Sequence, residues 1–165
     1  MDVFLSTLDG IFLVDIRTTM VSLFIGNLSL ALIVSFYLSS HVRESIPRAL
    51  KLYCASKYVH AAAWLLLSLR GSIADALSIG MANTLLFFGF FLESATMLEL
   101  ISRRKELFQR VQFVFLVAGL VFFYLVWTLY DSPNRRISVA SIVVVLMYSV
   151  PTLMFCFNKE KSRFR

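Results

Sequence analysis

The sequence has little of what a soluble enzyme or a disulfide-stabilised protein needs. Its two cysteines, Cys54 and Cys156, are too few for a disulfide framework or a thiolate metal site. Three prolines and six glycines in 165 residues argue against disorder and against an irregular all-β chain. There is also no glycine-rich phosphate loop, no Ser/His/Asp set, no paired-histidine motif and no CxxC. We therefore expect no catalytic residues, no metal and no cofactor.

Charged residues are also scarce, at 16% of the chain, whereas apolar residues reach 59% and include 16 phenylalanines. A soluble domain of this size must cover itself with polar surface and has no use for so much apolar residue. The composition therefore predicts an all-α, polytopic transmembrane helix bundle.

The apolar residues fall into five runs, each about long enough to cross a hydrocarbon core of roughly 30 Å. Together they define a bundle over residues 18–158, with a segment in the membrane interface before it (1–17) and a basic cytoplasmic tail after it (159–165). The first segment could equally extend the first span. The predicted spans are about 18–39, 51–69, 76–100, 111–130 and 137–157.

The basic residues predict the orientation of these spans. An N-out, C-in arrangement places twelve of the 16 lysines and arginines on the inner side of the membrane, as the positive-inside rule requires. The net charge of +6 lies in short loops, so we expect contact with anionic membrane lipids and not with nucleic acid.

Three ionisable residues, Lys57, His60 and Glu93, lie within predicted spans, where such groups are costly and are functional candidates by default. Glu93 lies about seven residues, roughly 10 Å, from the inner end of its span. Lys57 and His60 bracket that depth in the preceding antiparallel span. The sequence therefore predicts that Glu93 pairs with Lys57, His60 or both. Two alternatives stay open: Lys57 could extend to the inner headgroups, and the cluster could be structural and not a ligand, proton or ion site.

Two asparagines and a proline complete the polar and irregular features of the spans. Asn27 and Asn83 have similar depths near the outer side, which predicts an amide–amide hydrogen bond between the first and third spans. The third span would then be the central helix that ties the first two together. Pro151, inside the last span, predicts a kink or a backbone carbonyl left free for a neighbouring helix.

Three stretches resemble a known kind of region. They are DIRTTMVSLFIGNLSLALIV, LLLSLRGSIADALSIGMANTLLFFGFFLE and the basic loop after the third span, which together cover roughly residues 15 to 105. The D-x-R-T opening and the R-G-x-x-x-D-x-L-S-I-x-x-A-N run resemble the N-terminal multi-pass membrane sensor region that precedes GGDEF diguanylate cyclase or histidine kinase domains in bacteria. No GGDEF sequence follows here, so the resemblance carries over no catalytic residue.

The resemblance implies an inner-membrane sensory or input module that relays a membrane or periplasmic signal to a cytoplasmic output domain or partner. It also implies signal transduction in a bacterial cytoplasmic membrane, with a possible homodimer or a cytoplasmic signalling partner. The alternatives are a small transporter or channel subunit, in which Glu93 and His60 would line a polar path, and a membrane scaffold or assembly partner.

Overall fold

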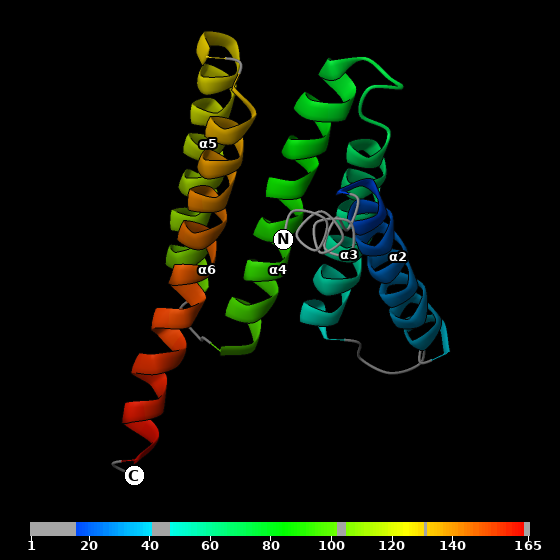
Figure 1. The fold of residues 1–165 in the computed structure, drawn as a ribbon. Coiled ribbons are helices and arrows are strands. Elements are labelled where there is room, and N and C mark those ends of the chain that lie inside the picture. The colour runs from blue at the N-terminus through cyan, green and yellow to red at the C-terminus, as the bar shows by residue number, and fades with distance from the viewer. Residues whose placement is uncertain (1–15, 41–46, 102–104, 131, 164–165) are drawn as a thin grey trace, which may run out of the picture.

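The structure is a computed structural model that describes residues 16–40, 47–101, 105–130 and 132–163. These residues form long helices that lie side by side (Figure 1) and, apart from one isolated bridge between Arg70 and Ile73, contain no β-structure. The predicted all-α bundle is confirmed. The elements are α2 (Ile16–Ser40), α3 (Arg48–Ser68), the π-helix η1 (Ala76–Met81), α4 (Ala82–Ile101), α5 (Lys105–Tyr130) and α6 (Pro133–Arg163).

Four of the five predicted spans are long and apolar enough to cross a membrane by length and composition. They are Ile16–Ser40, Ala76–Leu100, Leu107–Tyr130 and Pro133–Cys156. The remaining predicted span, 51–69, is the helix α3. It falls below that level of apolarity because it carries Lys51, Lys57 and His60. Its 21 residues nevertheless reach about 30 Å at 1.5 Å per residue, and it packs between α2 and α4.

The helix α4 lies in the middle of the bundle (Figure 1). On one side it packs along α3, which in turn carries α2, and on the other side it packs against the α5–α6 hairpin. The prediction that the third span ties the first two together is wrong in one respect. The extensive contacts of α2 are with α3, so α3 and not α4 joins it to the bundle.

Both sides of α4 depend on close packing, but of different kinds. Toward α5 and α6 it meets an apolar core that includes Phe87, Phe123 and Met147, three of the largest fully buried side chains. On its other side α4 packs along α3, a helix that buries the small residues Ala61 and Ala63. Small residues let helix backbones approach closely in membranes.

A short turn joins α3 to η1, and the start of α2 contacts it. Gly71 has a φ of +84°, a left-handed conformation that favours glycine and ends the helical path. Arg17 Nη2 donates a hydrogen bond to the Arg70 carbonyl at 3.0 Å, which places the start of α2 beside this turn. The predicted segment 1–17 otherwise lies outside the described residues.

The last helix is longer than its predicted span. It begins at Pro133, which suits the first turn of a helix because the N–H that proline lacks has no helical partner there. It continues through Pro151 to Arg163, so the predicted basic tail is helical as far as that residue. Its 31 residues correspond to about 46 Å, and its end extends beyond the neighbouring helices (Figure 1).

Candidate functional site

The predicted ion pair between Glu93 and Lys57 is present. Lys57 Nζ, from α3, lies 2.9 Å from Glu93 Oε1 on α4. Only 10% of the Lys57 side chain and 18% of the Glu93 side chain are exposed. Lys57 also lies over the Tyr53 ring, with its Nζ 5.0 Å from the ring centroid. Lys57 therefore points into the bundle, which contradicts the alternative that it extends to the headgroups.

His60 completes the predicted cluster from the same face of α3, because residues three apart in a helix are neighbours. Its Nδ1 lies 3.7 Å from Glu93 Oε2, and its ring centroid lies 4.5 Å from that of Phe90. The ring is almost fully buried and lies directly against the backbone at Gly89, where a Cβ atom would come within 2.5 Å of His60 Cδ2. His60 Nε2 has no hydrogen-bond partner in the part of the chain that the structure describes.

A fourth residue, Tyr148 on α6, approaches Glu93 from the other side of α4. Its hydroxyl lies near the Glu93 carboxylate, and its ring packs edge-on against Phe90 with centroids 5.9 Å apart. Sequence reasoning missed this residue. The available signal was its depth, one turn before Pro151. Glu93 thus contacts the α3 side and the α6 side of the bundle at one level.

The predicted bond between Asn27 and Asn83 is not formed. Asn27 Nδ2 donates to the Leu23 carbonyl at 2.8 Å, and Asn83 Nδ2 donates to the Ile79 carbonyl at 2.7 Å, each within its own helix. The physical reason is the order of the helices, since α3 lies between α2 and α4. Equal depth does not make two helices neighbours, and an amide in lipid can satisfy itself on its own backbone.

The prediction that Pro151 leaves a backbone carbonyl free for a neighbouring helix is confirmed. Proline has no N–H, so the carbonyl of Met147, four residues earlier, has no helical donor at position 151. Ser94 Oγ, from α4, donates to this carbonyl at 2.8 Å. Gln112, from α5, bonds to Ser94 through Nε2 and lies 3.5 Å from the same carbonyl. Three helices therefore meet at one polar point.

Sequence reasoning also missed the roles of Ser94 and Gln112. Both side chains are fully buried, and Gln112 Oε1 has no hydrogen-bond partner among the described residues. The signal for Gln112 was an amide near the start of an otherwise apolar span. Ser94 directly follows Glu93, so α4 directs adjacent polar side chains to its two opposite partners.

The chemistry available to the cluster is limited to charge and hydrogen bonding. It contains one carboxylate, so a pair of carboxylates for acid–base catalysis is missing from it. Among the described residues, no group of three His, Cys, Asp or Glu side chains could hold a metal ion. The arrangement can hold helices together, and it can change their packing when a charge or hydrogen bond changes.

The fold and the buried polar cluster define a polytopic helical membrane protein. Comparison with protein-family models, curated proteins and solved structures finds no match for the chain. The resemblance to bacterial membrane sensor regions therefore stays a prediction.

Proposed function

We propose that this chain is a bacterial inner-membrane sensory or input module that relays a membrane or periplasmic signal to a cytoplasmic output domain or partner. The observation that supports it is the position of Glu93. This carboxylate pairs with Lys57 at 2.9 Å, lies 3.7 Å from His60 Nδ1 of α3, and lies near Tyr148 of α6. It is therefore a point at which a change on one side of α4 reaches the other.

The path from Glu93 to the cytoplasmic side would be α6. Ser94 holds this helix one residue after Glu93, at the Met147 carbonyl that Pro151 leaves free. The helix then continues as far as Arg163, past the ends of its neighbours (Figure 1). In the N-out, C-in orientation, this extension lies in the cytoplasm. A small rotation or tilt at Ser94 would therefore move a cytoplasmic helix end.

A relay needs two states whose populations a signal can shift. Here the two states would be Glu93 paired with Lys57 and Glu93 released from it. Glu93 is about a fifth exposed, so a signal that alters its surroundings can reach it, whereas Lys57 is nearly buried. A ligand or proton that favours one state shifts the balance by its difference in affinity for the two.

The test is a fusion in which a cytoplasmic output domain follows α6. Glu93→Gln removes the charge and keeps the shape, and it should change the output several-fold at equal membrane abundance. Asn83→Ala is the matched control, since Asn83 is on the same central helix but its side chain donates to the Ile79 carbonyl of its own helical path. An output that Glu93→Gln leaves at the level of the control would reject the relay and favour the transporter or scaffold alternatives.

A further inference from the structure

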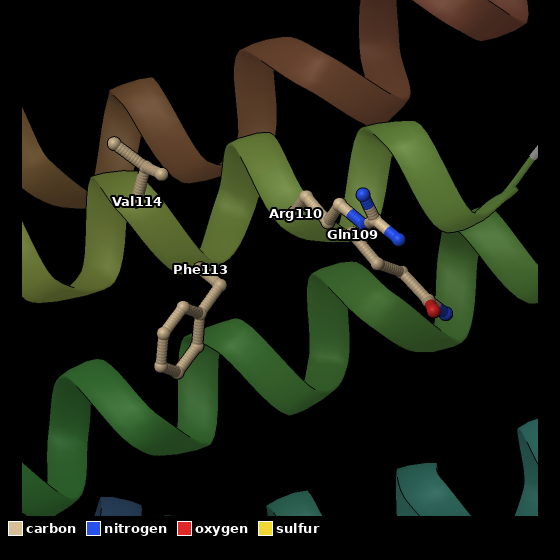
Figure 2. Close-up of a pocket in the computed structure, with 4 residues that line it drawn as sticks. All are labelled: Gln109, Arg110, Phe113 and Val114. Atoms are coloured by element: carbon tan, nitrogen blue, oxygen red, sulfur yellow. The ribbon is translucent and has the colours of Figure 1, made fainter.

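The start of α5 carries an open groove of about 530 Å³ that takes no part in the Glu93 cluster. The described residues that line it are Gln109, Arg110, Phe113 and Val114 (Figure 2). Its lining combines an amide, a guanidinium and two apolar side chains, and this combination indicates what kind of molecule the groove can bind.

Along α5 the lining residues are first a polar pair, Gln109 and Arg110, and one turn later an apolar pair, Phe113 and Val114. Gln109 and Phe113 are four residues apart, as are Arg110 and Val114, so each pair lies on one face of the helix. Figure 2 shows Gln109 and Phe113 reaching from α5 toward α4, whereas the Arg110 guanidinium stays at the level of α5. The Phe113 ring meets Phe91 of α4 edge-on, with centroids 6.3 Å apart, which gives the groove an aromatic wall.

The depth of the groove matches the boundary between headgroups and hydrocarbon. The apolar span of α5 begins at Leu107, so Gln109 and Arg110 lie within its first turn. Phe113 and Val114 lie one turn, about 6 Å, deeper. These two side chains are 55% and 60% exposed in the isolated chain, so in a membrane they face lipid.

The charge of the groove selects the occupant. The salt bridges given for the described residues, Lys57–Glu93 and His60–Glu93, do not involve Arg110. The exposed guanidinium next to a glutamine amide offers several hydrogen-bond donors to an anion, and arginine recognises phosphate well.

From this geometry we infer that the groove binds one anionic phospholipid. The phosphate contacts Arg110 and Gln109, and an acyl chain lies along Phe113 and Val114. The match rests on the polar-to-apolar order of the side chains, on their depth and on the charge of Arg110. It does not depend on the relay proposed for Glu93.

Native mass spectrometry of the full chain tests the inference. The chain is purified in detergent and given equal amounts of phosphatidylglycerol and phosphatidylcholine with identical acyl chains. The wild type should retain one phosphatidylglycerol in preference to phosphatidylcholine. Arg110→Gln should lower that preference about fivefold, the effect of about 1 kcal/mol for one basic residue near the surface. Arg135→Gln is the control. Arg135, near the start of α6, is also exposed, but it lies over the ring of Tyr130, at the end of α5 that is far from the groove.

The apolar half of the site has its own test. Phe113→Ser should reduce the retention of both lipids alike, and excess inorganic phosphate should leave the bound lipid in place because the acyl chain anchors it. Circular dichroism checks that the variants stay helical. The inference is overturned if Arg110→Gln keeps the wild-type preference or if free phosphate displaces the lipid.

Discussion

At Gly89 the absence of a side chain decides where His60 can lie. The His60 ring occupies the space that a Cβ atom would take, and this places its Nδ1 near Glu93. A histidine buried against a helix backbone cannot move aside easily, because the interior of a bundle is close-packed. The position of His60 in the cluster thus depends on Gly89, a residue without a side chain, as well as on the ionisable residues.

Gly89→Ala should destabilise the protein by about 1–3 kcal/mol, the cost of overpacking a filled interior. Gly26→Ala is the matched control. A Cβ at Gly26 would meet no atom within 4 Å, so this change should be neutral or slightly stabilising in its helix. The free energy of unfolding in mixed micelles measures both. Equal effects of the two substitutions would contradict the close contact with His60.

The pair of Lys57 and Glu93 predicts a non-additive result. Lys57→Met leaves Glu93 without its nearest cation, and Glu93→Leu leaves Lys57 buried and charged, so each single change should cost about 3 kcal/mol, as when one partner of a buried pair is removed. The double variant should be less destabilised than either single one, since no uncompensated charge is left. Unfolding in mixed micelles again provides the measurement. A double variant that loses the sum of the single effects would show that the pair contributes nothing as a unit.

Among the elements, α6 shows how a helix break becomes a contact. Pro151 leaves the Met147 carbonyl free, and α4 and α5 use it through Ser94 and Gln112. In a membrane an unsatisfied carbonyl is expensive, so this bond fixes where α6 meets α4.

Ser94→Ala should therefore cost on the order of 1 kcal/mol in the wild type and much less in the Pro151→Ala background, because the substituted alanine supplies an N–H to the Met147 carbonyl. Ser138→Ala is the control, since Ser138 Oγ bonds to Asn134 of its own helix. A double-mutant cycle on unfolding free energies measures the coupling. Coupling that is zero for Ser94, as for Ser138, would contradict the role given to the freed carbonyl.

The positions of the helices could be predicted from the sequence better than which helices pack against one another. Long apolar runs and the scarcity of charge in spans were enough to locate the helices and to pair Glu93 with Lys57, since the fixed rise of a helix converts sequence position into depth. Depth does not identify which helices touch, and for that reason the prediction of a hydrogen bond between Asn27 and Asn83 was wrong. The depth of Tyr148 and the amide of Gln112 were visible in the sequence, but the partners of Tyr148, Ser94 and Gln112 were not, because they depend on how α4 packs against α5 and α6.

For the whole molecule, α4 joins two groups of helices that otherwise have few contacts: α2 with α3, and α5 with α6. Glu93 faces both groups and Ser94 binds the second. The central claim is that the charge of Glu93 sets the arrangement of the two groups. If so, neutralising it should move the ends of α2 and α6 relative to each other.

The most direct measurement is the distance between spin labels at the ends of those helices in lipid nanodiscs, by pulsed electron paramagnetic resonance. One label is attached to the exposed Cys156 of α6 and the other to Ser40→Cys of α2, with the buried Cys54 replaced by alanine. We expect a narrow distance distribution that shifts or splits in Glu93→Gln and stays unchanged in Asn83→Ala. The same distribution in the parent protein and in Glu93→Gln would contradict it.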